Sequence, residues 1–446
     1  MASDKFQKSK TIMRTKKIST ATALTAALAL TLTGCSMGAP SGGSQQNTSA
    51  DSKLTVWVMQ GDQSAGTLKA INDRFTKETG AKVNIQTQQW TDINTKVTTA
   101  LSTDTPPDVI DFGNTQVAGF ADSGGIMDLT EYADDIRQGN TWLSGLEEPA
   151  TIDGKLYGIP ALGAARAVVY NKKVWAAAGI DKVPTSYAEL ESDLQKLKDA
   201  NAGGDFTPFY LPGRDWKSAV QWIWDAGGDF AEQHDGAWSS SLSSEKSLKG
   251  LDDWVQFQHK WSSEASRALD TDSPDISQLM AEGKVGAIIN NSASIRTIQQ
   301  FNPDIKATDL GSFPMPGLSG KSQPSMMAGS VWGVAQKSRN QDLAIKWIKI
   351  AASPEIQSDY VFGKDGWMPN YVEGLDKAMA SSDFPDYLTG FFESAKRTKA
   401  TPASPQWLTI ENDGSLQCFK DIATGSQDAA TAAKTFDEHA NGLYSK

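Results

Sequence analysis

The sequence predicts an α/β protein of two lobes that follow an exported N-terminal segment. Strand-like and helix-like stretches alternate along the chain, which is typical of α/β domains. The alternation restarts after residue 160, and the 446-residue chain is longer than one hydrophobic core usually serves. The first fifty residues read as an export signal followed by a tether.

The N-terminal segment has the parts of a secretory signal. Basic residues precede an uncharged run over residues 18–33 that is too short to span a bilayer. Residues 32–35, Leu-Thr-Gly-Cys, resemble the lipobox of bacterial lipoproteins, so residues 1–34 are predicted to be removed and Cys35 to carry the lipid. The alternative is an ordinary signal with an incidental cysteine, and Met13 is an alternative start. Residues 35–51 are rich in Ser, Gly, Gln and Asn and predict a flexible tether.

Composition limits the possible partners. The formal charge of −11 argues against nucleic acid, whose phosphates require a basic surface. Once Cys35 is acylated, Cys418 has no cysteine partner, so we expect no disulfide and a buried thiol.

Apolar spacing predicts the elements of the first half. Strands are expected at 54–58, 82–86 and 108–112. Leu68, Ile71 and Phe75 share one helical face, and Gly80 follows where a helix-ending glycine belongs.

The second half repeats the pattern. Ser186 and Glu189 have the spacing of a helix-capping box. We expect strands at 167–170, 207–211, 285–290 and 330–335, helices at 172–178, 186–197, 248–258 and 344–351, and a mostly helical chain from 354 onward.

Familiar catalytic motifs are missing. The sequence has no H-E-x-x-H, no C-x-x-C and no phosphate-binding loop, and His234, His259 and His439 are predicted to be surface residues. We therefore expect no catalytic residue, metal or cofactor. The 53 acidic residues leave a carboxylate pair of the kind that glycosidases use as an open alternative.

Tryptophan is abundant, with fourteen in the chain. A flat ring packs on the apolar face of a sugar while polar neighbours bond the hydroxyls. Trp216, Trp332, Trp367 and Trp407 are candidates because turns or glycines flank them. Core positions are expected for Trp224, Trp254 and Trp347, which lie on apolar helical faces.

Several segments resemble the extracellular solute-binding proteins of ATP-binding-cassette (ABC) importers, in the sugar-binding family that includes maltose-binding protein. The order and spacing of 153–160, 169–173 and 184–186 is the most specific match. The other similar segments are 54–57, 61–62, 107–110 and 119–126, with weaker matches at 283–287 and 338–341.

The resemblance implies the two-lobe, type II periplasmic-binding-protein-like fold, with lobes joined by hinge strands. One lobe is expected to comprise 52–161 and 306–355, and the other 162–305 and 356–446. The resemblance places ligand contacts at Asp62, Gln63, Asp111, Asn114, Ala164, Arg166, Asp215, Trp216, Trp407 and Glu411. The remaining candidates are Gln60, Asn290, Asn291, Trp332 and Trp367.

The implied protein is a monomeric, lipid-anchored receptor on the outer face of a bacterial cytoplasmic membrane. It would capture a neutral oligosaccharide and deliver it to the permease subunits of an ABC importer. Where maltose-type members carry a stacking tryptophan, residues 291–293 are Asn-Ser-Ala, which disfavours a simple maltodextrin. An exported glycoside hydrolase and a surface carbohydrate-binding adhesin remain the alternatives.

Overall fold

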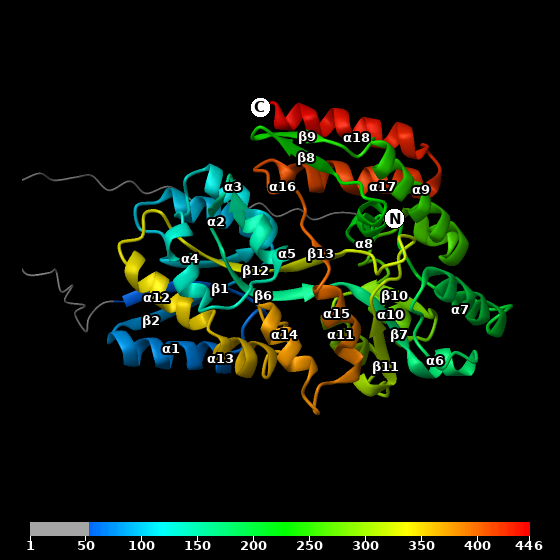
Figure 1. Ribbon diagram of the computed structural model, residues 1–446, viewed down its shortest axis with the longest axis horizontal. Helices are drawn as coiled ribbons and strands as arrows, with labels where there is room; N and C mark the ends of the chain where they lie inside the picture. The colour runs from blue at the N-terminus through cyan, green and yellow to red at the C-terminus, as the bar shows by residue number, and fades with distance from the viewer. Residues whose placement is uncertain (1–52) are drawn as a thin grey trace, which may run out of the picture. The chain divides into compact units, whose positions relative to one another are not determined.

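The computed structural model describes residues 53–446 (Figure 1). The predicted signal peptide, Cys35 and the tether lie outside this range. Within it, helices and strands alternate as an α/β fold, which confirms the predicted fold class. No helix of the described range is both long and apolar enough to cross a membrane.

The first sheet is mixed, and its strands run in the order β13-β12-β3-β1-β2, with β6 also paired to β12. Both β2 and β3 pair with β1 in parallel, whereas β12 runs antiparallel to β3 and to β6. Its strands are β1 (Lys53–Met59), β2 (Lys82–Gln88), β3 (Val109–Gly113), β6 (Ile159–Ala165), β12 (Ser325–Val334) and β13 (Thr398–Lys399).

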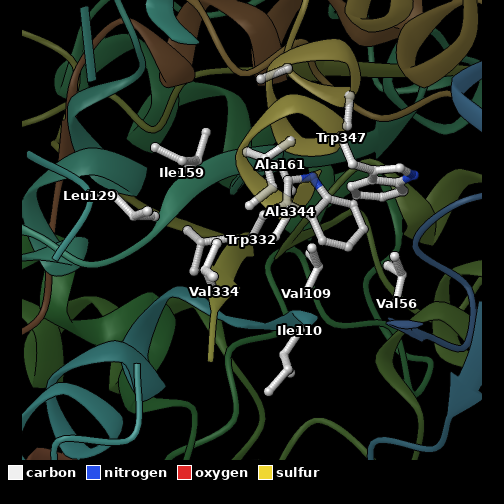
Figure 2. Close-up of a cluster of buried hydrophobic side chains, with 14 of the residues drawn as sticks. Val56, Val109, Ile110, Leu129, Ile159, Ala161, Trp332, Val334, Ala344 and Trp347 are labelled. Carbon is white, nitrogen blue, oxygen red and sulfur yellow. The ribbon is translucent and has the colours of Figure 1, made fainter. Parts of the chain in front are cut away.

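A buried core covers this sheet. Val56 and Val109 from the strands meet Trp332 of β12 and Trp347 of α12 (Gln341–Ala351) in one apolar cluster (Figure 2). The two indole rings pack edge to face with centroids 4.9 Å apart. The indole nitrogen of Trp347 donates to Asn72 Oδ1 at 2.8 Å, which joins α12 to α1 (Ala65–Thr79).

The second sheet is antiparallel, in the order β10-β7-β11. Its strands are β10 (Ala287–Asn290), β7 (Ala167–Asn171) and β11 (Leu310–Phe313). Val168 packs into one apolar cluster and Val169 into another, because neighbouring side chains of a strand point to opposite faces. The second sheet is therefore covered on both sides.

Two strands contribute to more than one cluster. In β12, Met326 and Met327 belong to the two clusters of the second sheet, whereas Val331 belongs to the cluster of the first. In β6, Leu162 and Ala165 divide in the same way. The paired strands β6 and β12 therefore join the two halves of the fold (Figure 1).

Two short hairpins and a set of helices complete the fold. The hairpins are β4 (Thr151–Ile152) with β5 (Lys155–Leu156) and β8 (Ala231–His234) with β9 (Ala237–Ser240). The other α-helices are α2 (Ile93–Ser102), α3 (Val117–Asp122), α4 (Ala133–Arg137), α5 (Ser144–Glu147), α6 (Lys172–Ala177), α7 (Tyr187–Ala200), α8 (Trp216–Asp225), α9 (Glu245–Trp261), α10 (Ile276–Ala281), α11 (Ala293–Phe301), α13 (Pro354–Ile356), α14 (Val372–Met379), α15 (Thr389–Ala395), α16 (Trp407–Ile410), α17 (Leu416–Thr424) and α18 (Ala429–Tyr444).

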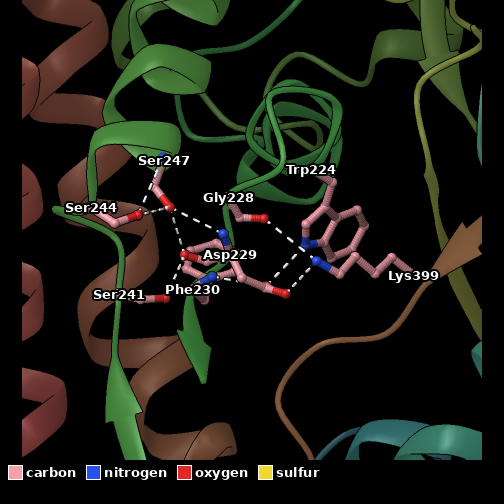
Figure 3. Close-up of polar contacts among 8 residues, drawn as sticks. All are labelled: Trp224, Gly228, Asp229, Phe230, Ser241, Ser244, Ser247 and Lys399. Atoms are coloured by element: carbon pink, nitrogen blue, oxygen red, sulfur yellow. Dashed lines mark hydrogen bonds and ion pairs between the residues drawn. The ribbon is translucent and has the colours of Figure 1, made fainter. Parts of the chain in front are cut away.

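A polar network anchors β13 to the second half of the chain. Lys399 of β13 lies 2.6 Å from Asp229 Oδ2, and the indole nitrogen of Trp224 donates to Asp229 Oδ1 at 3.0 Å (Figure 3). The Ser247 hydroxyl donates to the carbonyl of Asp229 at 2.9 Å and accepts from its backbone N–H at 3.0 Å. Asp229, in the loop after α8, is therefore supplied with both a cation and hydrogen-bond donors.

Most predicted elements are confirmed. Gly80 ends α1 in the left-handed conformation at φ 74°. Ser186 caps α7, and the carboxylate of Glu189 accepts from the backbone of Thr185. The three histidines are exposed, Cys418 is buried and free, and Trp224, Trp254 and Trp347 are core residues as predicted.

The predicted strand at 207–211 is wrong. Thr207 and Tyr210 make only isolated bridges to Val285 and Ile288. Pro208 and Pro212 lack a backbone N–H, so this segment cannot complete a ladder of hydrogen bonds.

Candidate functional site

Two carboxyl groups meet near the carboxyl ends of the neighbouring strands β1 and β3. Because β1 and β3 are parallel, Asp62 beyond the end of β1 lies near Asp111 of β3. The Ser330 hydroxyl of β12 donates to Asp62 Oδ2, and the backbone N–H of Met59 donates to Asp111 Oδ2 at 3.0 Å. Three strands thus supply one polar cluster, which we call the acid pair (Asp62, Asp111 and Ser330).

Burial makes the acid pair hard to ionise. Burial raises the pKa of Asp62 to about 6, although hydrogen bonds from Ser330 and Asp111 oppose the rise. Burial and the neighbouring charge of Asp62 raise the pKa of Asp111 well above its usual range. Asp111 is fully buried and its Oδ1 has no partner among the described residues. Asp111 therefore contacts Asp62 from within the fold, and its own carboxyl group cannot reach a ligand in this arrangement.

The loop that carries Asp62 touches a second loop. The indole nitrogen of Trp367 donates to the Gly61 carbonyl at 3.4 Å, and the backbone N–H of Ser64 donates to Asp365 Oδ2 at 3.3 Å. Gln63 Oε1 and Asp365 Oδ1 are buried acceptors without a partner in the described chain. The acid pair and these two loops form a surface that offers hydrogen-bond acceptors beside an indole ring, and we call it the acceptor edge.

Asn114 and Arg166 lie where the two halves join. The Asn114 amide donates to the carbonyls of Gly145 and Met327 at 3.0 and 3.1 Å, so both of its amide protons are used within the fold. The backbone N–H of Arg166 donates to Ser325 Oγ at 2.9 Å, and its guanidinium reaches Ser218 Oγ at 3.5 Å. Arg166 remains partly exposed, whereas Asn114 is buried.

The candidates from the second half gather around two buried indoles. Trp216 is 2% exposed and Trp407 is 0% exposed, and their rings meet edge to face with centroids 6.0 Å apart. Burial raises the pKa of Glu411, although Lys217 Nζ, 3.6 Å from its Oε1, opposes the rise. Asp215 accepts from the Ser218 backbone and hydroxyl at 3.3 and 2.5 Å and so caps α8. The side chains do meet, but neither indole exposes a face to a ligand.

Trp332 needs a correction as well. It was predicted to stack on a ligand, yet it is 1% exposed and lies in the core of the first sheet (Figure 2). The reason is its place in β12, opposite Asp111 in the middle of the sheet, where α12 covers it. Trp367 is the one stacking candidate that keeps part of its ring accessible.

Asn290 and Asn291 follow the end of β10. Their side chains accept backbone N–H groups, Asn290 Oδ1 from Asn291 at 2.9 Å and Asn291 Oδ1 from Ala293 at 3.0 Å. Next to them, Ser292 and Ala293 line a cavity that Trp367 also lines. This cavity brings the start of α11 and the acceptor edge to one place.

Three site residues were not predicted. Ser330 and Asp365 enter through contacts across more than 260 residues of chain, for which no local pattern exists. Trp90 is 42% exposed in the loop after β2, and the backbone N–H of Gln60, which is itself exposed, donates to the Gln88 carbonyl at 2.8 Å beside it. Because the loops after parallel strands meet at one edge, the spacing of β1 and β2 could have pointed to Trp90.

The site lacks the arrangement of a metal enzyme. Over residues 53–446, no three His, Cys, Asp or Glu side chains are grouped so as to hold a metal ion. What the arrangement can do is accept hydrogen bonds from hydroxyl or amide groups and cover an apolar face with an indole ring.

Known proteins are similar to this chain in sequence and in fold. The diacetylchitobiose binding protein DasA of Streptomyces coelicolor is 33% identical over 88% of this chain and 90% of its own. The maltodextrin-binding protein MdxE of Bacillus subtilis is 24% identical over 91% of this chain and 92% of its own. The sugar-binding protein MalE of Xanthomonas citri has a similar structure, with a TM-score of 0.76 at 19% identity over 88% of this chain and 98% of that one.

A family model described as bacterial extracellular solute-binding protein matches residues 61–358. Its members bind solutes and are not enzymes, so the glycoside hydrolase alternative has no support. Together with the match to DasA over most of both chains, this establishes that the chain belongs to the bacterial extracellular solute-binding protein family.

Proposed function

We propose that this protein captures an oligosaccharide at the acceptor edge, between the two lobes, and delivers it to the permease of an ABC importer. The observation that carries the proposal is the acceptor edge itself, where carboxylate and amide oxygens lack partners within the described chain and the Trp367 indole bonds to the loop of Asp62. Sugar hydroxyls need such acceptors, and the apolar face of the ring packs on indole.

The relatives support a sugar and disagree about which one. One is named for diacetylchitobiose and another for maltodextrin. A structural neighbour from Listeria monocytogenes was solved with maltose. The names of the relatives therefore support an oligosaccharide as the ligand class. Which oligosaccharide binds depends on the residues of the cleft.

Binding would close two lobes on the ligand, by selection of a closed arrangement. Because β11 pairs with β7, residues 310–313 belong to the second sheet. This pairing favours a passage of the chain between the lobes along β12 instead of near residue 305. Ile356, Val361 and Tyr371 pack in the cluster of the first sheet, which favours a third crossing after residue 371 instead of near 355. The remaining boundary near residue 162 is compatible with β6.

A lipid on Cys35 would hold the receptor at the membrane. The lipobox-like residues 32–35 and the polar tether support this part of the proposal. The Cys35→Ala variant is expected to leave the membrane fraction and remain exported. If that variant still sediments with membranes, lipid anchoring through Cys35 is refuted.

The ligand class is tested by a thermal-shift screen of the chain from Ser36 onward. Neutral oligosaccharides, sugar phosphates, polyols and amino acids form the panel. A ligand at about a hundred times its dissociation constant stabilises the native state by about 2.7 kcal/mol, which the screen resolves. Stabilisation by oligosaccharides alone supports the proposal, and a hit confined to amino acids or phosphates contradicts it.

A further inference from the structure

A cavity of about 300 Å³ lies between the start of α11 and the acceptor edge. It is lined by residues at the start of α11, by the loop Asp365 to Trp367, and by Tyr387 with Leu388. The contacts of Trp367 with Gly61 and of Asp365 with Ser64 join this cavity to the loop of Asp62. The cavity is thus an extension of the proposed sugar site.

One wall supplies a free cation. Arg296 lines the cavity and is exposed. Arg137 pairs with Glu147 and Arg214 with Asp270, whereas no acidic side chain of the described range lies in ion-pair distance of Arg296. Its guanidinium protons are therefore available to a ligand acceptor.

Asp365 also lines the cavity and supplies an acceptor. Asp365 Oδ2 accepts from the Ser64 backbone at 3.3 Å, whereas its Oδ1 is buried without a partner in the described chain. A buried acceptor that lacks a donor destabilises the protein until a donor arrives. Arg296 and Asp365 together offer one cationic donor and one anionic acceptor, so a neutral group with both an acceptor and an N–H matches them better than an ion does.

Aromatic surface completes the lining. Trp367 and Tyr387 are both partly exposed and border the cavity. A small apolar group such as a methyl gains from packing on such rings.

We propose that this cavity binds the acetamido substituent of an N-acetylated sugar. Arg296 donates to the carbonyl oxygen, the carboxylate of Asp365 accepts from the amide N–H, and the rings of Trp367 and Tyr387 cover the methyl. This assignment rests on the proposed oligosaccharide function and narrows it to oligosaccharides of N-acetylhexosamine.

The test compares two disaccharides with one skeleton. N,N′-diacetylchitobiose and cellobiose are both β-1,4-linked glucose-type pairs and differ only at C2, where one carries acetamido and the other hydroxyl. Calorimetric titration of the exported chain is expected to give an affinity for N,N′-diacetylchitobiose at least about tenfold higher, because cellobiose leaves the cavity groups unpaired. Equal affinities overturn the assignment and leave the oligosaccharide function standing.

A matched pair of variants assigns the effect to the cavity. Arg296→Met is expected to lower the affinity for N,N′-diacetylchitobiose about tenfold and to change cellobiose binding little, so the discrimination narrows. Arg339→Met removes the same charge from an exposed arginine before α12 and is expected to change neither affinity. If Arg296→Met still prefers N,N′-diacetylchitobiose over cellobiose as strongly as wild type does, the proposal is overturned. If no oligosaccharide of any kind binds the wild-type chain, the proposed function and this inference both fail.

Discussion

Two regions of the molecule hold carboxylates that are partly or fully buried, and the two regions differ in the hydrogen-bond donors that they supply. Asp229 lies 2.6 Å from Lys399 and accepts from the Trp224 indole at 3.0 Å and from the backbone N–H of Phe230 at 2.8 Å (Figure 3). Asp62 and Asp111 share one hydroxyl from Ser330 and one backbone N–H, and nothing cationic contributes to the shift of either pKa. The first arrangement stabilises the fold. The second stores unused hydrogen-bonding capacity, which is what a ligand site needs.

The core beneath the acid pair should give the largest effect. Trp332→Ala removes a fully buried indole, and we expect the free energy of unfolding to fall by about 3 to 5 kcal/mol. Chemical denaturation followed by circular dichroism measures the loss. A drop below about 1 kcal/mol, together with weakened sugar binding, would return Trp332 to the ligand site.

The paired carboxylate should come next. Asp229→Ala leaves Lys399 without its partner and the Trp224 indole without an acceptor, and we expect a loss of about 2 to 4 kcal/mol. Lys399→Met should cost about 1 kcal/mol, because that lysine is partly solvated. Sugar affinity should stay unchanged in both variants. A change in affinity without a change in stability would mean that the network serves the ligand.

The acid pair should respond to pH in the opposite direction to an ion pair. Its carboxyls have raised pKa values, so the folded protein binds more protons than the unfolded chain between the ordinary pKa near 3.8 and about 6. The free energy of unfolding must therefore fall as pH rises through this window. Asp111→Asn keeps a donor toward Asp62 and removes one acid, so we expect it to raise stability at pH 7 by about 1 to 3 kcal/mol.

Denaturation of wild type and Asp111→Asn at pH 4 and pH 7 checks this prediction. The gain from the substitution should be small at pH 4, where both acids are mostly protonated, and should grow toward pH 7. Asp108→Asn is the control, because the Asp108 carboxylate accepts hydrogen bonds from the Thr55 backbone and the Ser338 hydroxyl. This variant is expected to be less stable than wild type. An equal effect of Asp111→Asn at both pH values would contradict the raised pKa values of the acid pair.

The exposed indoles should give the smallest change in stability. Trp367→Ala is expected to lower sugar affinity by about 1 to 2 kcal/mol while stability changes by less than about 1 kcal/mol. Trp90→Ala provides the comparison on the neighbouring loop. Unchanged affinity for Trp367→Ala would remove stacking from the account of the acceptor edge.

Sequence patterns predicted most of the fold because its signals are local. The alternation at 54–58 and the helical face of Leu68, Ile71 and Phe75 depend only on neighbours in the chain, and they became β1 and α1. The stretch at 207–211 has a strand-like composition, but its prolines prevent a ladder.

The site was predicted less well because its contacts are distant in sequence. Glycine neighbours suggested an exposed Trp332, but the sequence does not reveal that α12 covers that part of β12. Asp62 and Gln63 do lie at the acceptor edge, whereas Asn114 and Asp215 use their side chains within the fold. Ser330 and Asp365 complete the edge from far along the chain, and only the folded arrangement reveals them.

If the acceptor edge binds the sugar, loss of the Asp62 carboxylate must weaken that binding. Titration of sugar into the Asp62→Ala variant measures this loss of affinity. The oligosaccharide that the thermal-shift screen selects would be titrated by calorimetry into wild type, Asp62→Ala and the folded Asp229→Ala variant. Asp62→Ala is expected to remain folded and to lose at least about tenfold in affinity, while Asp229→Ala binds as wild type. Wild-type affinity in Asp62→Ala would contradict binding of the sugar at the acceptor edge.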